Sequence, residues 1–446
     1  MKAYSTDNYG EFREREVYST NEPPTGSYTI EVTDDVISSG FQGFGVAVTG
    51  SSCYLLSRMD KKKRKAILSD LYGADGLGLS VARLTIASSD YSAELYSYED
   101  ENGNFSVKKD EAYVLPVVTE IAKSYKDVKF FASPWSPPGR MKTGGSICGG
   151  FMRDGFIGEY VDYILSFVKE YTRRGVPIWA ITPQNECETD QGGRMPACYW
   201  SPETEAKFVL ALRKKADEQG VPIEIWLCDH NFTLYKRVIW QLKEFPELKT
   251  AASSVAFHYY GGGVELTDHI KREFPEFTYH FTEGGPRLYD NYETDYCKWG
   301  VIMARNLNYG CKSFTGWNLA LDEAGLPNVG PFFCGGLITE HSVTKEITYS
   351  GQYKAFKHFS PFIKRGASVL YSSVLGESQA LSLYPNQVTP TIEACAVKNE
   401  DGSVVLNIMN PDKKERRQTV ISYKGKYYYF DALPDSVNTV ILEERV

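Results

Sequence analysis

The chain has 446 residues, of which 42% are hydrophobic and 24% are charged, and its formal net charge is −8. This length exceeds one ordinary domain, so we expect one large domain and one smaller domain. The negative net charge argues against a nucleic-acid partner, because such partners are held mainly by basic side chains on phosphates.

The start of the chain predicts no export or membrane signal. Residues 1–20 are polar and charged and lack the apolar segment of a signal peptide. No stretch approaches the ~20 apolar residues that a membrane-spanning helix needs. Nine cysteines are scattered without the spacing of a zinc site. We therefore expect reduced thiols and a cytoplasmic protein, or a secreted one if a signal peptide was removed.

A strand is predicted first at residues 28–32, and from residue 41 onward short apolar runs alternate with helical segments. Such runs, bounded by turn or polar residues, predict buried strands. Eight of them occur, at residues 41–48, 80–86, 129–133, 179–183, 224–228, 254–258, 278–282 and 313–319. Eight strands, each followed by a helical segment over ~300 residues, indicate an α/β protein with a (β/α)₈ barrel.

Three of the intervening helices have clear signals. Ser57 and Asp60 resemble a capping box at the start of a helix that Gly73 could end. The basic residues 61–65 in this helix predict a solvated face, given the negative net charge. Two further helices are predicted at residues 156–171, from the spacing of apolar side chains, and at residues 201–220.

After about residue 350 the pattern changes to short alternating runs separated by turn residues, which is typical of an all-β sandwich. The predicted strands are residues 379–384, 391–398, 403–409, 418–422 and 439–442. This set lacks one partner strand, which residues 28–32 could supply. We predict a catalytic barrel at residues 38–349 and a discontinuous β-sandwich domain formed by residues 1–37 and 350–446.

Two glutamates follow barrel strands, Glu186 after the fourth and Glu283 after the seventh. Chemistry in such barrels takes place at the carboxyl ends of the strands. Two facing carboxyl groups suit glycoside hydrolysis, with one as proton donor and the other as nucleophile or base. A separation near ~5 Å predicts retention of configuration, and ~6.5–9.5 Å predicts inversion. Asn185, beside Glu186, offers a carboxamide that can hold a hydroxyl group.

Seven motifs follow one another along the chain at the ends of predicted strands. They are Gly43-Phe44-Gly45; residues 83–90 with Tyr96-Ser97-Tyr98; residues 132–138 with Met141-Lys142-Thr143; residues 182–186; residues 256–260; Thr282-Glu283; and residues 316–321. In this order they resemble glycoside hydrolase family 30, the family of lysosomal glucosylceramidase and bacterial β-glucosidases. The resemblance covers nearly the whole chain, and residues 132–138 are its most specific part.

The resemblance implies a retaining mechanism with Glu186 as general acid/base and Glu283 as nucleophile. It also implies that Asn185 hydrogen-bonds the 2-hydroxyl of the sugar. Arg83 and Tyr260 would then keep Glu283 ionised and oriented, since a cation and a phenol donor favour a charged carboxylate.

The remaining implied site residues surround the sugar. Asp90, Trp135 and Trp317 would line the −1 subsite, and His258 would lie between the two glutamates as a hydrogen-bond partner. We do not expect His258 to bind a metal, because no second ligand stands at ligand spacing along the chain. No cofactor is implied, and a carbohydrate or glycoside is the expected partner.

Three departures from the family pattern leave the substrate open. Cys187 replaces the usual proline after the acid/base glutamate, Gly316 replaces an aspartate, and residues 284–286 after the nucleophile also differ. We expect hydrolysis of β-D-glucosides, such as a glucosylceramide-like lipid or a β-1,6-glucan. The alternatives are a β-xyloside, β-fucoside or β-galactoside specificity, or a barrel that binds carbohydrate without cleaving it. Exo or endo action and the oligomeric state stay open.

Overall fold

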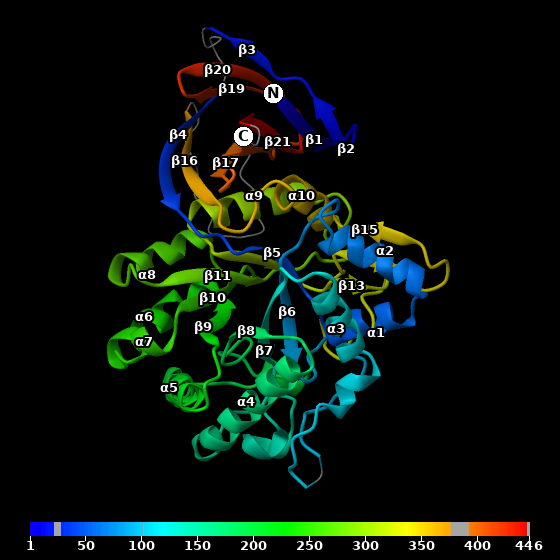
Figure 1. The fold of residues 1–446 in the computed structure, drawn as a ribbon, viewed down its shortest axis with the longest axis vertical. Coiled ribbons are helices and arrows are strands. Elements are labelled where there is room, and N and C mark those ends of the chain that lie inside the picture. Colours follow the sequence, from blue (N-terminus) through cyan, green and yellow to red (C-terminus); the bar gives the residue numbers. More distant parts are fainter. Residues whose placement is uncertain (22–27, 101, 376–391, 444–446) are drawn as a thin grey trace.

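The protein has two bodies, a closed barrel surrounded by helices and a β sandwich stacked against it (Figure 1). The structure is a computed structural model that describes residues 1–21, 28–100, 102–375 and 392–443. Across these residues no helix has both the length and the apolar character to cross a bilayer. The predicted fold class, an α/β barrel with an appended sandwich, is confirmed.

Eight parallel strands close the barrel in the order β10-β11-β12-β5-β6-β7-β8-β9, and each coincides with one of the eight predicted runs. Nearly all of their residues are buried, because helices cover the outer face and side chains fill the interior. The strands are β5 Gly43–Ala47, β6 Val81–Ile86, β7 Lys129–Pro134, β8 Ile178–Ile181, β9 Glu224–Asn231, β10 Ser254–His258, β11 Thr278–Glu283 and β12 Ser313–Gly316.

Helices connect the strands and cover the outside of the barrel. The α-helices are α1 Gly50–Arg58, α2 Lys61–Tyr72, α3 Val114–Ser124, α4 Ile157–Arg173, α5 Pro202–Glu218, α6 Tyr235–Glu244, α7 Leu248–Ala251, α8 Thr267–Glu273, α9 Tyr296–Asn308 and α10 Gly351–Phe359. Short 3₁₀ turns span Lys108–Ala112, Gly139–Met141, Thr143–Gly145, Asp154–Phe156, Gln191–Gly193, Phe232–Leu234 and Val264–Leu266. The helices predicted at residues 156–171 and 201–220 are confirmed by α4 and α5.

The predicted start of the helix after the first barrel strand is wrong. Ser57 lies inside α1, and the backbone becomes extended at Met59. Asp60 therefore caps α2, and its carboxylate accepts a hydrogen bond from the backbone N–H of Lys63 at 2.9 Å. A capping side chain has to lie directly before the unpaired N–H groups of the first turn, and only Asp60 does so. Gly73 ends this helix, as predicted.

The sandwich is built from one hydrogen-bonded sheet in the order β2-β1-β21-β18-β17-β16-β4-β19-β20-β3. Its strands are β1 Lys2–Asp7, β2 Gly10–Arg15, β3 Tyr18–Thr20, β4 Tyr28–Ser38, β16 Ser368–Leu375, β17 Glu393–Lys398, β18 Val404–Asn410, β19 Arg417–Tyr423, β20 Lys426–Ala432 and β21 Ser436–Glu443. The strand predicted at residues 28–32 pairs with β16 and β19. The strand predicted at residues 379–384 lies outside the described residues, and the exact domain boundaries stay a prediction.

A small three-stranded sheet completes the barrel side of the molecule. It consists of β13 Ala320–Leu321, β14 Ile338–Glu340 and β15 Ile347–Tyr349, in that order. Strand β13 follows β12 closely and packs against α1. This sheet holds the long segment after the eighth barrel strand against the first barrel helix.

Helices α9 and α10 join the two bodies. A side-chain carbon at Gly300 of α9 would lie 2.9 Å from the Val437 side chain, so the glycine permits close contact with the sandwich. On α10, the two ring nitrogens of His358 lie 2.9 Å from Thr439 Oγ1 and 2.8 Å from Thr6 Oγ1. The sandwich therefore supports two barrel helices, and none of its described residues lines the pocket discussed below.

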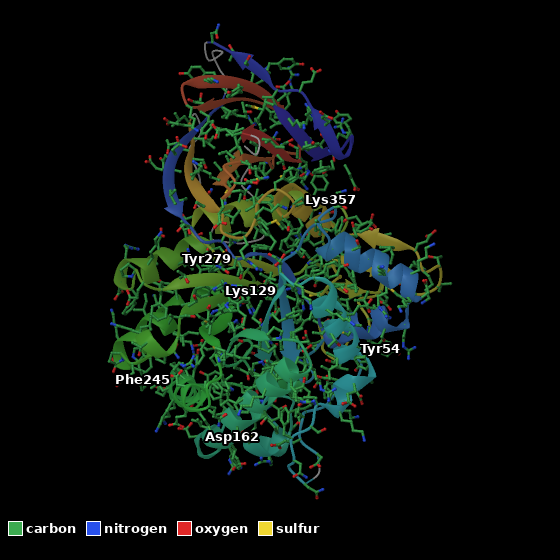
Figure 2. All side chains as sticks on the ribbon, viewed as in Figure 1. Tyr54, Lys129, Asp162, Phe245, Tyr279 and Lys357 are labelled. Atoms are coloured by element: carbon green, nitrogen blue, oxygen red, sulfur yellow. The ribbon has the colours of Figure 1, made fainter. Side chains whose placement is uncertain are left out.

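Apolar side chains fill the lower part of the barrel. The indole of Trp226 stacks on the ring of His280 with 3.7 Å between ring centroids. Figure 2 shows side chains packed between the strands and the surrounding helices, with Lys129 and Tyr279 on barrel strands and Asp162 on α4. The interior is a packed core, as in other barrels of this type. The buried cluster consists of Val81, Phe131, Ala180, Trp226 and Ala256.

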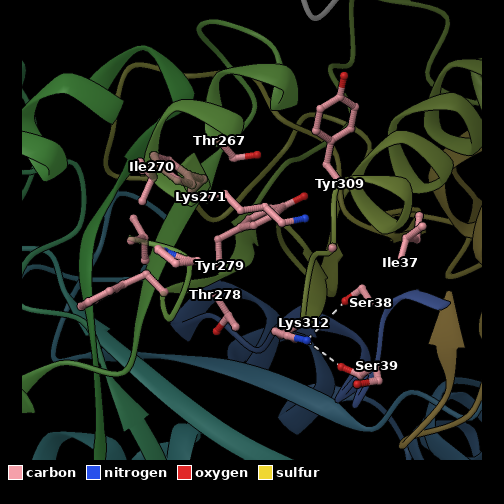
Figure 3. A pocket seen from close by; sticks show the side chains of 15 residues that line it. Ile37, Ser38, Ser39, Thr267, Ile270, Lys271, Thr278, Tyr279, Tyr309 and Lys312 are labelled. Atoms are coloured by element: carbon pink, nitrogen blue, oxygen red, sulfur yellow. Dashed lines mark hydrogen bonds between the residues drawn. The ribbon is translucent and has the colours of Figure 1, made fainter. Parts of the chain in front are cut away.

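A pocket of about 260 Å³ lies at the amino-terminal ends of β10 and β11 (Figure 3). Lys312 Nζ donates hydrogen bonds to Ser38 Oγ at 3.3 Å and to the carbonyl of Ser39 at 2.6 Å. These bonds tie the end of β4 to the barrel. Because chemistry in such barrels takes place at the opposite end, this pocket marks a junction between the bodies.

Candidate active site

A second pocket, of about 280 Å³, opens at the carboxyl ends of the barrel strands. It brings together all the predicted site residues, although they are spread along the chain from residue 83 to residue 317. Arg83 and His258 lie beneath it and are fully buried. The predicted residues that line it are Asp90, Trp135, Asn185, Glu186, Tyr260, Glu283 and Trp317. The other lining residues are Thr189, Gln191, Met195, His230, Asn231, Arg287, Phe332 and Cys334.

Glu283 is the last residue of β11, and two donors hold its carboxyl group. Arg83 Nη1 donates to Glu283 Oε2 at 2.6 Å, and the Tyr260 hydroxyl donates to Oε1 at 3.1 Å. Arginine does not lose its proton in proteins, so the guanidinium presents a permanent positive charge to this carboxyl group. The two contacts fix the orientation of Glu283 toward the pocket.

Asp229, which the sequence analysis did not single out, anchors the polar network beneath the pocket. Its Oδ2 accepts from Arg83 Nη2 at 2.8 Å, and its Oδ1 lies 3.1 Å from His258 Nε2. Further donors to this carboxylate are the hydroxyls of Ser133, Thr182 and Thr282, at 2.6 to 2.8 Å. Although burial opposes it, the charge of Arg83 holds the pKa of Asp229 well below its usual range.

Glu186 lies in the turn after β8 in a left-handed backbone conformation, with φ of 51°. Asp229, across the turn, has φ of 52°, and the N–H of Glu186 donates to the Asp229 carbonyl at 2.9 Å. Non-glycine residues at positive φ are uncommon and cluster at functional sites. The side chain accepts a hydrogen bond from Gln191 Nε2 at 2.7 Å. The left-handed backbone at Glu186, beside an irregular part of the neighbouring strand β9, and the bond from Gln191 hold Glu186 at the pocket.

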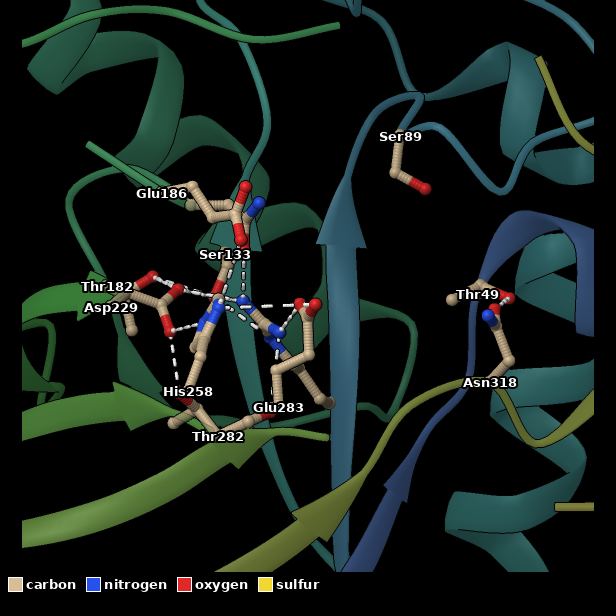
Figure 4. Close-up of polar contacts among 12 residues, drawn as sticks. Thr49, Ser89, Ser133, Thr182, Glu186, Asp229, His258, Thr282, Glu283 and Asn318 are labelled. Carbon is tan, nitrogen blue, oxygen red and sulfur yellow. Dashed lines mark hydrogen bonds and ion pairs between the residues drawn. The ribbon is translucent and has the colours of Figure 1, made fainter. Parts of the chain in front are cut away.

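His258, the last residue of β10, lies between the two glutamates (Figure 4). Its Nδ1 is 3.5 Å from Glu186 Oε1 and 4.0 Å from Glu283 Oε1. Glu186 Oε1 and Glu283 Oε1 can therefore be no further apart than the sum of these two distances. Glu186 and Glu283 face one pocket, as a reaction at a single anomeric centre requires.

Burial and neighbouring charges act in opposite directions on these groups. Burial, together with the charge of Glu186, raises the pKa of Glu283 although His258 and Arg83 oppose it. Burial also acts to raise the pKa of Glu186, but the contact with His258 and the charge of His230 lower it on balance. Burial disfavours a charged His258, yet the surrounding carboxylates raise its pKa to about 10. The imidazole ring of His258 is therefore protonated, and this charged ring lies between the two glutamates.

Two indole rings form one wall of the pocket. Trp135 and Trp317 stack with 5.2 Å between ring centroids and 18° between ring planes. The Arg83 guanidinium lies 4.9 Å from the Trp135 ring and 5.5 Å from the Trp317 ring, a favourable arrangement for a buried cation. Asp90 Oδ1 is buried without a hydrogen-bond partner among the described residues. This oxygen can therefore accept a hydrogen bond from a hydroxyl group of a ligand bound in the pocket.

Comparisons with known proteins identify the family of both domains. Residues 41–363 match the family model described as the glycosyl hydrolase family 30 TIM-barrel domain, and residues 380–440 match the family 30 beta sandwich domain. Putative glucosylceramidase 3 of Caenorhabditis elegans is 27% identical over 449 residues, covering 94% of this chain and 83% of that protein.

Two solved structures are similar over nearly their whole length. SrfJ from Salmonella typhimurium has a TM-score of 0.90 at 24% identity, covering 100% of this chain and 99% of that chain. The endo-β1,6-glucanase BT3312 has a TM-score of 0.85 at 25% identity, and 98% of each chain is covered. The fold and the paired carboxyl groups define a barrel glycoside hydrolase. The chain belongs to glycosyl hydrolase family 30.

Several residues of the site escaped sequence reasoning. Asp229 and His230 directly follow the predicted strand at residues 224–228, and this position at a strand end was the signal that could have found them. Gln191 begins a short 3₁₀ turn and Arg287 lies in a loop, and in neither place can side-chain direction be read from strand or helix periodicity.

Proposed function

We propose that the protein hydrolyses β-D-glucosidic bonds with retention of configuration, with Glu283 as nucleophile and Glu186 as general acid/base. The observation that carries hydrolysis is that both carboxyl groups reach His258 Nδ1, at 3.5 and 4.0 Å, and so face one anomeric centre. Retention of configuration rests on the family match. Tyr260 and Arg83 hold Glu283 in the manner expected of a carboxylate that has to attack an anomeric carbon.

Before a sugar binds, the pKa of Glu283 is raised and the pKa of Glu186 is lowered, which is the reverse of the proposed roles, so sugar binding has to change this balance. A sugar in the pocket excludes water, which strengthens direct electrostatic contacts. The contact with Arg83 then favours the charged form of Glu283. Glu186 has no guanidinium or ammonium bonded to it among the described residues, and the protonated His258 lies 3.5 Å away. Within the described ranges Glu186 lacks the permanent guanidinium that holds Glu283 ionised, so we assign proton transfer to the leaving oxygen to Glu186.

Each step of the proposed reaction can then be assigned to particular residues. Glu283 attacks the anomeric carbon and forms a glycosyl ester, while Glu186 gives its proton to the departing oxygen. Glu186, now ionised, removes a proton from water, which attacks the same carbon and releases Glu283. The stacked indoles and Asp90 bind the ring that is transferred.

Asn185 is oriented for the sugar 2-hydroxyl. Its Oδ1 accepts a hydrogen bond from Arg83 Nη2 at 2.8 Å, which determines which way the carboxamide points. Its amide N–H groups are therefore free to donate into the pocket that Asn185 lines. A donor at this place strengthens its bond to the 2-hydroxyl as charge develops on the ring in the transition state.

The stereochemical course tests this proposal directly. Proton NMR of an aryl β-D-glucoside during hydrolysis should show the β-anomer of glucose first and the α-anomer only later, as the released sugar mutarotates. The α-anomer as first product would exclude double displacement. If no aryl β-glycoside in a panel of glucoside, xyloside, fucoside and galactoside is cleaved, the barrel binds sugar without cutting it.

The rim of the pocket favours an apolar aglycone. Tyr289, Leu326 and Phe333 belong to segments next to the lining residues Arg287 and Cys334, and their side chains are 73%, 47% and 64% exposed. The segments that carry Tyr289 and Phe333 are adjacent, because the N–H of Leu288 donates to the Phe333 carbonyl at 3.3 Å. Exposed apolar side chains beside a sugar pocket provide a surface for lipid chains, so we propose a glucosylceramide-like substrate.

The double variant Tyr289→Ser, Phe333→Ser tests the role of the rim. We expect kcat/KM on glucosylceramide in detergent micelles to fall about tenfold or more, because ~1.4 kcal/mol of apolar contact is lost. The value on gentiobiose, a β-1,6-linked disaccharide, should change little. Tyr9→Ser is the matched control, since Tyr9 is 75% exposed on the sandwich. A larger loss on gentiobiose than on the lipid would favour a β-1,6-glucan substrate, with the rim aromatics stacking on sugars.

A further inference from the structure

Three potential metal ligands converge at the mouth of the barrel from three successive strands. Glu186 follows β8, His230 lies near the end of β9, and His258 ends β10. One ligand atom from each lies within 4.8 Å of the others. Spacing along the chain conceals this group, because the three residues approach only where neighbouring strands end at the same edge of the barrel.

Each of the two histidines has one ring nitrogen that makes no hydrogen bond within the described residues. His258 Nδ1 and His230 Nδ1 are buried and have no hydrogen-bond partner among the described residues. A buried polar atom without a partner is costly, so each nitrogen is a place where a ligand atom can be accommodated favourably. The His258 side chain is fully buried, and the two imidazole rings lie 6.2 Å apart between centroids.

The other nitrogen of His258 is held as in known metal sites. Nε2 lies 3.1 Å from Asp229 Oδ1, and Asp229 is itself bonded to Arg83. Histidines that bind metals almost always bond their second ring nitrogen to a carboxylate or carbonyl, which fixes the ring and leaves the first nitrogen for the ion. The same contact here directs Nδ1 of His258 toward Glu186.

We propose that Glu186, His230 and His258 bind a divalent transition-metal ion such as Zn²⁺, and that this ion inhibits the enzyme. The inhibitory part rests on the proposed function, in which Glu186 is the proton donor. Two imidazoles and one carboxylate, with a fourth position open to the pocket, form a ligand set that zinc accepts in proteins. Mg²⁺ and Ca²⁺ prefer oxygen ligands, so neither should bind here.

The ion would block catalysis at one defined atom. A carboxylate oxygen of Glu186 bonded to zinc can neither donate a proton to the leaving oxygen nor accept one from water. Zinc also needs a neutral imidazole, so it displaces the proton from His258. Because Glu186 and His230 line the sugar pocket, the ion and the sugar exclude each other. Inhibition should therefore be competitive with substrate and reversed by a chelator.

Zinc binding can be measured without turnover. Calorimetric titration of chelator-treated enzyme with Zn²⁺ should show one site per chain, and Mg²⁺ at the same concentration should give no binding heat. In parallel, the inhibition constant for Zn²⁺ is measured with an aryl glycoside. Absence of a one-to-one zinc site would overturn the proposal whether or not the enzyme hydrolyses glucosides. Binding of zinc without inhibition would refute the inhibitory part while leaving the site in place.

Ligand variants identify the site. His230→Ala and Glu186→Gln should each weaken zinc binding at least about tenfold by calorimetry, because each removes one of three ligands. For His230→Ala the inhibition constant should rise by a similar factor, measured against the activity of that variant without zinc. The matched control is His341→Ala, since His341 Nε2 lies 3.8 Å from Glu323 Oε1 at the surface. Equal weakening in the control, or none in His230→Ala, would show that zinc binds elsewhere.

Discussion

Glu283→Gln is expected to lower kcat/KM by a factor on the order of 10⁴ or more on every substrate, whatever its leaving group. A carboxamide cannot attack the anomeric carbon, so the glycosyl ester does not form. The fold should persist, because Arg83 keeps its second ion pair, to Asp229 at 2.8 Å. The measurement compares initial rates on a dinitrophenyl glucoside and an alkyl glucoside.

Glu188→Gln is the matched control for this variant. Glu188 lies on the same loop as Glu186, pairs with Arg237 at 3.1 Å, and is not among the residues that line the pocket. It should retain activity close to that of the wild type. Activity of Glu283→Gln within tenfold of the wild type, with an unchanged melting temperature, would remove Glu283 from the reaction and reopen the choice of nucleophile.

Glu186→Gln should lower the rate of hydrolysis by an amount that depends on the leaving group of the substrate. On an alkyl glucoside, which requires protonation, we expect a loss of about 10²–10⁴-fold. A dinitrophenyl glucoside leaves without a proton, so formation of the glycosyl ester should be nearly normal and its hydrolysis slow. A burst of dinitrophenol followed by slow turnover is the expected time course.

A small anion provides a second test of the same variant. Azide needs no base to attack the glycosyl ester, so it should accelerate turnover of Glu186→Gln and yield the β-glucosyl azide with release of the Glu283 carboxylate. The wild type should respond little, because water is already activated there. Equal losses on both glucosides and no effect of azide would undo the acid/base assignment.

The eight barrel strands could be predicted because each is decided locally. Both faces of a parallel strand are buried, so the sequence has to be a short apolar run between polar turns, and this pattern needs no knowledge of partners. Helices α4 and α5 were readable for a similar reason, since one face of each packs on the barrel. The start of α2 was misplaced because capping depends on where the preceding helix ends.

Several sandwich strands carry no such local pattern. Strand β1 is mostly polar, and it becomes a strand by pairing with β21 at the other end of the chain, with Ala3 opposite Val440. Strand β20 pairs with β19 and β3 and has no alternation of apolar and polar residues. Strands β2, β3 and β16 were missed in the same way. Strand formation here depends on neighbours distant in sequence, which a local reading does not contain.

The candidate site shows the same difference between what local sequence patterns reveal and what depends on contacts between distant residues. Glu186, Glu283 and their neighbours were found from the sequence, because strand ends and short motifs mark them one at a time. The sequence by itself determined which residue types stand at the carboxyl ends of the strands. Only the tertiary structure decided which atoms meet: Asp229 joining Arg83 to His258, and His230 turned toward Glu186. Distances between side chains arise from closure of the barrel, which brings the ends of strands far apart in sequence to one rim.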